Sequence, residues 1–167
     1  MLFPQKIPST LNINKLELPS DVVQRIQNGP RPRIVGGTQT TDRTDYPWFC
    51  SLISASGTSP YCGGSYIGGP YVVTAAHCAY FSGASQVRVV MGHITTTEIG
   101  DGTGTIYNVE RIIMSHNYND STIDSDIAIL ELTRSPSSDG FSPISVATSG
   151  FGAGEGAGTP VTVLGFG

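Results

Sequence analysis

The sequence predicts an all-β fold. Short apolar runs of 4 to 9 residues alternate with turns rich in Gly, Ser and Asp. The 167 residues include 21 glycines and 11 prolines, and only 13% are charged, which suits a turn-rich β protein better than a helical bundle. Short strands at this spacing predict an antiparallel barrel or sandwich. The predicted strands are Phe49–Ser54, Gly64–Ile67, Tyr71–Thr74, Val87–Met91, Ile106–Met114 and Ile127–Leu132.

The chain is expected to divide into three parts. Residues 1–33 form a polar, proline-rich leader, and residues 34–146 contain the six predicted strands. Residues 147–167 contain a glycine-rich connector and one more predicted strand, Val161–Phe166. That last strand has no partner strand in the sequence, so this third part is interpreted as a fragment rather than a domain.

Charge and hydropathy exclude two classes of partner. The net charge of −4 comes without a basic stripe, which argues against a nucleic acid partner. No apolar run approaches the roughly 20 residues that cross a bilayer, so we expect no membrane segment. Met1-Leu2-Phe3 is interrupted by Pro4 and leads into no apolar h-region, so no signal peptide is visible in the chain.

A candidate cleavage site ends the leader. Pro30-Arg31-Pro32-Arg33 is an extended basic stretch that a protease is expected to bind, and Ile34-Val35-Gly36-Gly37 follows it directly. Cleavage after Arg33 would create an α-amino group on Ile34, and burial of this charge against a carboxylate would act as an irreversible switch. Taken alone, the motif is better explained as a glycine turn after an ordinary linker.

Four further motifs support the cleavage-site interpretation. In chain order they are Tyr46-Pro47-Trp48, Cys62-Gly63-Gly64-Ser65-Tyr66-Ile67, Val73-Thr74-Ala75-Ala76-His77-Cys78 and Asp126-Ile127-Ala128-Ile129-Leu130. In the order, spacing and residue identities of these motifs, the sequence from Ile34 to Gly167 resembles the trypsin/chymotrypsin family of serine endopeptidases. Val161–Gly167 is similar to that family's entry into its second barrel, with Phe166 where tryptophan is usual.

The resemblance implies a fold, an activity and partners. The fold is the first six-stranded antiparallel barrel of the chymotrypsin-like double barrel, followed by the first strand of a second, incomplete barrel. The activity is that of a serine endopeptidase zymogen with residues 1–33 as propeptide, acting on polypeptides and activated by a protease that cleaves after Arg33. By family resemblance the protein is expected to be extracellular, and no cofactor or metal is implied.

His77 and Asp126 are the predicted catalytic residues. Imidazole takes up and returns a proton near neutral pH, and a carboxylate that accepts from Nδ1–H holds it in one tautomer. Asp124 is a rival for the acid from its position alone. The family motif places the acid directly before Ile-Ala, which selects Asp126.

The three cysteines allow one internal disulfide with one cysteine left over. A zinc site of Cys62, His77 and Cys78 is an alternative by ligand type, but adjacent His-Cys without a second pair does not resemble a structural zinc site. A Cys62–Cys78 disulfide is preferred, and the corresponding pair is bonded in the family. Cys50 alternates with Trp48 and Leu52 on one strand face, so we expect a small buried hydrophobe. A bond to a cysteine beyond Gly167 is the less favoured alternative.

Other polar residues give weaker signals. Asn119-Asp120-Ser121 is a sequon for N-glycosylation, relevant if the protein enters a secretory pathway. His93 and His116 border turns and are predicted to be solvated loop histidines. A calcium site is not predicted, because the acidic residues near the position used by some relatives form a poor ligand pattern: Glu98, Asp101 and Glu110.

No Gly-Asp-Ser-Gly-Gly segment occurs in the sequence, so no serine is nominated as the nucleophile. We expect the chain by itself to be inactive. Three explanations stay open: a fragment of an active endopeptidase, a non-catalytic pseudoprotease that binds proteins, and one half of a split protease. Since the family's specificity pocket also lies in the second barrel, the residue preference of cleavage cannot be predicted.

Overall fold

The computed structural model describes residues 37–80, 82–147 and 158–166, which belong to one compact unit. The predicted leader and the cleavage site between Arg33 and Ile34 lie outside the described residues.

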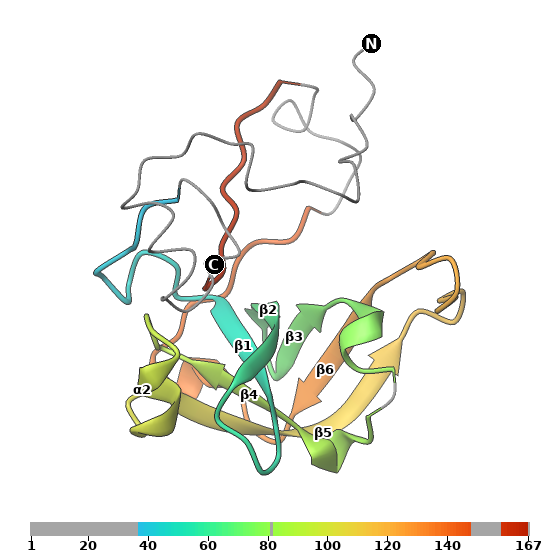
Figure 1. Ribbon diagram of the computed structural model, residues 1–167, viewed down its shortest axis with the longest axis horizontal. Coiled ribbons are helices and arrows are strands. Elements are labelled where there is room, and N and C mark those ends of the chain that lie inside the picture. Colours follow the sequence, from blue (N-terminus) through green and yellow to red (C-terminus); the bar gives the residue numbers. More distant parts are fainter. Residues whose placement is uncertain (1–36, 81, 148–157, 167) are drawn as a thin grey trace, which may run out of the picture. The chain divides into compact units, whose positions relative to one another are not determined.

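A closed antiparallel barrel forms the body of the described unit (Figure 1). Its strand order is β1-β2-β3-β6-β5-β4. The strands are β1 (Phe49–Ser54), β2 (Pro60–Gly68), β3 (Tyr71–Thr74), β4 (Val87–Met91), β5 (Thr105–Met114) and β6 (Ala128–Leu132). The predicted six-stranded barrel is thereby confirmed, and three of the six strands have the predicted bounds.

Helical structure in the described residues consists of short turns between the strands. These are η2 (Ala76–Cys78), η3 (Ala84–Gln86), α2 (Thr97–Gly100) and η4 (Pro136–Asp139). No helix in this part of the chain is long and apolar enough to cross a membrane.

Burial alternates along β6, as expected for a barrel strand with one face inside. Ala128, Leu130 and Leu132 are buried, whereas the two residues between them are partly exposed. β1 differs, because four consecutive residues in it are buried. Cys50 and Leu52 face the main core, and the opposite face is also covered.

The outer face of β1 is covered by a second, smaller cluster. Ile53 packs there with Val90 of β4 and Ile99 of α2. The short helix α2 therefore covers one side of the barrel, next to β1 and β4 (Figure 1).

Close strand packing explains one of the glycines in β2. A Cβ on Gly64 would lie 2.9 Å from the Val73 carbonyl oxygen and 3.0 Å from Cys50 Sγ. The first distance is shorter than real Cβ contacts and the second is tighter than most of them, so a side chain at this position would force β1 or β3 away. The prediction that Cys50 is a buried hydrophobe is confirmed, since its thiol is free and fully buried.

The prediction of a strand at Val161–Phe166 is wrong for this structure. No strand is assigned there, and the side chains of Val161 and Val163 are 83% and 71% exposed. The segment is apolar like a strand, but a strand requires a hydrogen-bonded neighbour, and no described strand pairs with this segment. Its last described residue, Phe166, contacts the barrel through the ring of Phe49, at 5.7 Å between centroids.

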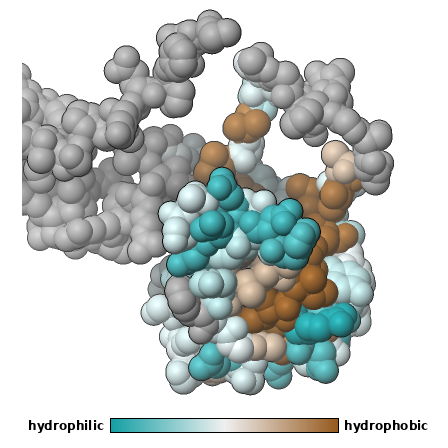
Figure 2. Space-filling view, turned by 90° about the vertical axis from the view of Figure 1, so that its right-hand side faces the viewer, coloured by the Kyte–Doolittle hydropathy of each residue, from teal (hydrophilic) through white to brown (hydrophobic). Residues whose placement is uncertain are grey.

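Apolar side chains also reach the barrel surface (Figure 2). Ile113 and Met114 at the end of β5 are exposed, and so is Ile127 directly before β6. The Ser115 N–H donates to the Ile127 carbonyl oxygen at 3.0 Å, so these residues lie at one end of the β5–β6 pair.

Candidate active site

The pairing of β3 with β6 brings two distant parts of the sequence together. In this antiparallel pair Thr74 lies opposite Ala128. His77 comes three residues after Thr74, and Asp126 comes two residues before Ala128. The chain leaving β3 and the chain entering β6 therefore meet at the same end of the barrel.

Small residues hold the turn that carries His77. Ala76 and Ala79 are fully buried, so η2 lies directly on the barrel. The His77 side chain points away from this contact and is 51% exposed. An imidazole on a buried, rigid turn is positioned for contact with an external molecule.

Asp126 binds His77 at two points. Its Oδ2 lies 2.7 Å from Nδ1 of the ring, and its Oδ1 accepts a hydrogen bond of 2.8 Å from the His77 backbone N–H. These hydrogen bonds, first the one from the backbone and then the one from the ring, lower the pKa of Asp126. An ionised carboxylate only accepts, so Nδ1 donates the ring hydrogen bond, and in the neutral imidazole Nε2 is then the acceptor.

Asp124, the rival acid, faces a different partner. Its carboxylate accepts a 2.6 Å hydrogen bond from Thr122 Oγ1, and its carbonyl oxygen accepts one of 3.1 Å from the Asn119 N–H. Asp126 is the acid next to His77, as the family motif indicates.

The loop before Asp126 contains two residues in the left-handed region. Ile123 and Ser125, on either side of Asp124, both have φ of 56°. This conformation is uncommon without glycine and costs roughly 1–2 kcal/mol per residue. The sequence contains no signal for it, because neither Ile nor Ser favours positive φ.

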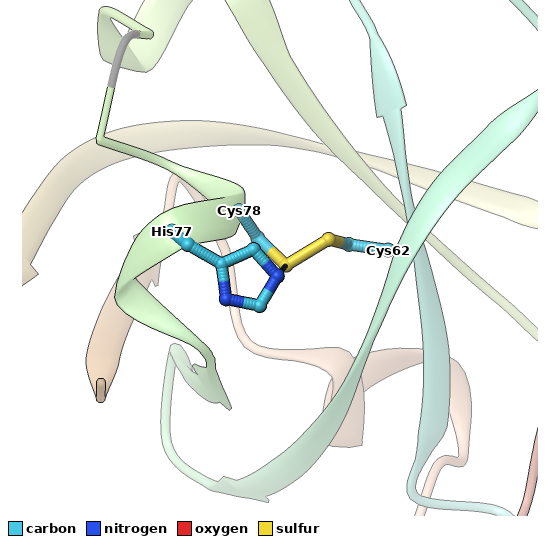
Figure 3. A group of neighbouring side chains, drawn as sticks. All are labelled: Cys62, His77 and Cys78. Atoms are coloured by element: carbon cyan, nitrogen blue, oxygen red, sulfur yellow. Dashed lines mark hydrogen bonds between the residues drawn. A yellow bond between two sulfur atoms is a disulfide. The ribbon is translucent and has the colours of Figure 1, made fainter. Parts of the chain in front are cut away.

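The cysteine prediction is confirmed. Cys62 of β2 and Cys78 of η2 form a disulfide with Cα atoms 6.1 Å apart. The bond fixes η2 to β2, and the His77 ring lies beside it, with Nε2 3.5 Å from Cys78 Sγ (Figure 3).

The ligand atoms of Cys62, His77 and Cys78 lie within 4.8 Å of one another, which is the geometric basis of the zinc alternative. Both sulfurs are consumed in the disulfide, so neither is a thiolate that could bind zinc. The grouping is a disulfide next to an imidazole.

An aromatic pair that the sequence analysis did not identify lies near His77. The rings of Tyr80 and Tyr118 meet edge to face with centroids 5.2 Å apart. The Tyr118 hydroxyl donates to Asp120 Oδ1 at 2.9 Å. Desolvation, followed by this hydrogen bond, raises the pKa of Tyr118 to about 12.

The prediction that His93 is solvated is wrong. The residue is 7% exposed, and its Nε2 lies 2.9 Å from the Oγ of buried Ser51. Its ring stacks on Phe166 at 5.1 Å and lies near Phe49. Burial lowers the pKa of His93 to about 4. His116 is exposed, as predicted.

Glu98 and Asp101, two of the acidic residues considered for a calcium site, are bound by other groups of the protein. Its carboxylate pairs with Arg43 at 3.0 Å and accepts a 2.6 Å hydrogen bond from the Ile94 N–H. Asp101 accepts a 2.9 Å hydrogen bond from the Thr103 N–H at a separate turn.

Asn119 is exposed in the loop between β5 and β6.

Comparison with known proteins agrees with this geometry. The family model for trypsin matches residues 34–167. The chain belongs to the trypsin family. Its relatives include CLIP domain-containing serine protease HP8 of Bombyx mori, 39% identical over 149 residues, or 79% of this chain and 39% of the relative. A trypsin of Phaedon cochleariae is 36% identical over 108 residues, or 65% of this chain and 40% of the relative.

A solved trypsin-like structure also matches the chain. The secreted serine protease VesC from Vibrio cholerae aligns with a TM-score of 0.58 and 32% identity, covering 68% of this chain and 23% of VesC. The chain therefore spans less than half the length of these relatives.

Proposed function

We propose that this chain is part of a serine endopeptidase zymogen in which His77 is the general base and Asp126 its orienting acid. The observation that carries the proposal is the two-point binding of His77 by Asp126, in a chain of the trypsin family. A carboxylate that holds both the backbone and the ring fixes the direction in which Nε2 accepts a proton.

The proposed reaction is acyl transfer from a polypeptide. Nε2 of His77 takes the proton of a serine hydroxyl as the oxygen attacks the scissile carbonyl carbon, and Asp126 stabilises the resulting imidazolium. The imidazolium then gives its proton to the leaving amine, and water hydrolyses the acyl-enzyme by the reverse sequence of proton transfers.

We propose that the serine comes from a second barrel outside residues 1–167. Two observations support this. The chain spans only 39% and 40% of two relatives that are named as proteases. Exposed apolar residues at one end of the barrel, Ile113, Met114 and Ile127, form a surface that another folded part would cover.

Cleavage between Arg33 and Ile34 is the proposed activation step, carried out by a separate protease. The family match begins at Ile34, which supports a mature chain that starts there. We propose an extracellular location, supported by the disulfide and by the secreted relative VesC.

The test uses the full-length protein from the uninterrupted reading frame. After cleavage with added trypsin and inactivation of that trypsin, N-terminal sequencing should read Ile-Val-Gly-Gly, and a serine-directed phosphonate should label the protein. His77→Ala should abolish labelling, while Arg33→Gln should prevent both cleavage and labelling. A cleaved protein that neither reacts with phosphonate nor hydrolyses peptide esters would favour the pseudoprotease alternative.

A further inference from the structure

The loop that leads to Asp126 contains the one Asn-X-Ser/Thr sequence among the 167 residues, Asn119-Asp120-Ser121. Such a sequence is the acceptor for N-linked glycosylation when it is exposed. Asn119 and Ser121 are both exposed in this structure. The sequon is therefore sterically open in the folded protein.

The Asn119 side chain is held by its oxygen alone. Oδ1 accepts hydrogen bonds from the N–H groups of Ser121 at 3.0 Å and Thr122 at 3.3 Å, which is an Asx-turn. In the described part of the chain, Nδ2 has no hydrogen-bond partner. Nδ2 is the atom to which a glycan is attached, so the turn orients the amide and leaves the reacting atom free.

The loop geometry places Asn119 close to the candidate active site. Asn119 and Asp124 form an isolated antiparallel β-bridge, in which the Asn119 N–H donates to the Asp124 carbonyl oxygen at 3.1 Å. Asp126 follows Asp124 by two residues, so the Cα atoms of Asn119 and Asp126 are separated by no more than roughly 13 Å. Tyr118, the residue before Asn119, contacts Tyr80, which comes three residues after His77.

We propose that Asn119 carries an N-linked glycan at the entrance to the His77–Asp126 site, where it slows large polypeptide substrates more than short peptides. The attachment joins Nδ2 to the anomeric carbon of a lipid-pyrophosphate-linked oligosaccharide. It breaks the bond from that carbon to the pyrophosphate oxygen and releases one proton from Nδ2. The effect on substrates rests on the proposed protease function, but the attachment does not.

Attachment is tested by translating the chain behind an added secretion signal in the presence of endoplasmic reticulum microsomes. Among the translocated, protease-protected chains, we expect one glycan that endoglycosidase H removes. Asn119→Gln and Ser121→Ala should each abolish it, and the matched control Asn117→Gln should retain it. Translocated chains without the added mass, or added mass that persists in Asn119→Gln, would overturn the proposal.

The effect on substrates is tested in the full-length, activated enzyme. Removal of the glycan, by endoglycosidase or by Asn119→Gln, should raise kcat/KM several-fold for a folded protein substrate and leave kcat/KM for a tripeptide ester unchanged. If the enzyme hydrolyses the ester but removal of the glycan does not raise kcat/KM for the protein substrate, the proposed effect of the glycan on substrates (the shielding role) is rejected and the protease function is not. If neither substrate is cleaved, the shielding role fails together with the protease function, and the attachment result stands separately.

Discussion

Both carboxylate oxygens of Asp126 bind the same residue, His77, one at the backbone N–H and one at ring Nδ1. The backbone bond fixes the carboxylate relative to η2, and the ring bond fixes the imidazole relative to the carboxylate. Orientation and tautomer of the His77 imidazole are therefore set by one side chain. Asp124, two residues earlier, makes neither contact.

Asp126→Asn in the full-length, activated enzyme should lower kcat on the order of 10⁴-fold, because the amide no longer holds Nδ1 as the protonated nitrogen. Asp124→Asn should change kcat little, since Asp124 interacts with Thr122 rather than His77. Steady-state hydrolysis of a peptide ester measures both. The reverse ranking of the two variants would show that the acid has been assigned incorrectly.

Loss of the disulfide should destabilise the barrel. Cys62 and Cys78 are 16 residues apart, and a loop of this length stabilises a fold by about 3 kcal/mol in the chain-entropy model. The double variant Cys62→Ser/Cys78→Ser should unfold at correspondingly lower urea concentration. Dithiothreitol should lower the urea midpoint of the wild type and leave that of the double variant unchanged. If the reductant affected both equally, its action would not depend on this bond.

The strands were predictable from the sequence because each buries apolar residues in a short run bounded by turns, as β6 does at Ala128, Leu130 and Leu132. The first four residues of β2, Pro60–Gly63, were not included in the prediction, because proline and glycine are depleted in strands. Its pairing with β1 imposes the extended conformation there. Val161–Phe166 shows the opposite error, because a short apolar run forms a strand only where a neighbouring strand is present.

Of the candidate site, His77, Asp126 and the disulfide pair were predictable because each belongs to a motif. The surroundings of His93 were not. Ser51, Phe49 and Phe166 bury it, and they come from parts of the chain far from it in sequence. No local pattern encodes such a contact.

Buried His93 should make the stability of the chain depend on pH. Its pKa is lowered to about 4 in the folded state, against roughly 6.5 in the unfolded state. Between these values the unfolded chain binds more protons, so stability is full above pH 6.5 and falls as the pH drops towards 4, by about 3 kcal/mol. Urea unfolding at several pH values should show this slope.

His93→Gln provides the comparison for this slope, since glutamine can bind Ser51 but does not titrate. The variant should lose most of the slope between pH 6.5 and 4. His116→Gln is the matched control, because His116 is exposed, and it should keep the wild-type slope. An unchanged slope in His93→Gln would mean that another group accounts for the pH dependence.

Arg43 should restrain the segment that follows the proposed cleavage site. Among the described residues before β1, only Arg43 has a side chain that hydrogen-bonds to residues after β1. Its guanidinium donates to the Gly92 carbonyl oxygen at 2.7 Å and to the Glu98 carboxylate. Arg43→Gln should speed hydrogen exchange in residues 38–48. Arg111→Gln, which removes the exposed pair with Glu131, should leave exchange there unchanged. Equal exchange in the two variants and the wild type would show that other contacts restrain this segment.

The chain expressed alone should be folded, inactive and prone to association. It should not hydrolyse peptide esters or react with serine-directed phosphonates, because under the second-barrel proposal the serine that His77 would activate lies outside this chain. Its exposed apolar residues Ile113, Met114 and Ile127 lie together at one end of β5 and β6, and such patches drive association in water. Sedimentation velocity should therefore show oligomers that increase with concentration.

Ile113→Thr/Ile127→Thr should shift this distribution towards monomer by removing apolar area from the patch. Ile106→Thr is the matched control, since Ile106 is also exposed but lies near the opposite end of β5, and it should leave association unchanged. If both variants reduced association equally, the contact would be non-specific. A monodisperse monomer with phosphonate-sensitive hydrolysis would mean that the chain contains a nucleophile of its own, and the second-barrel proposal would have to be abandoned.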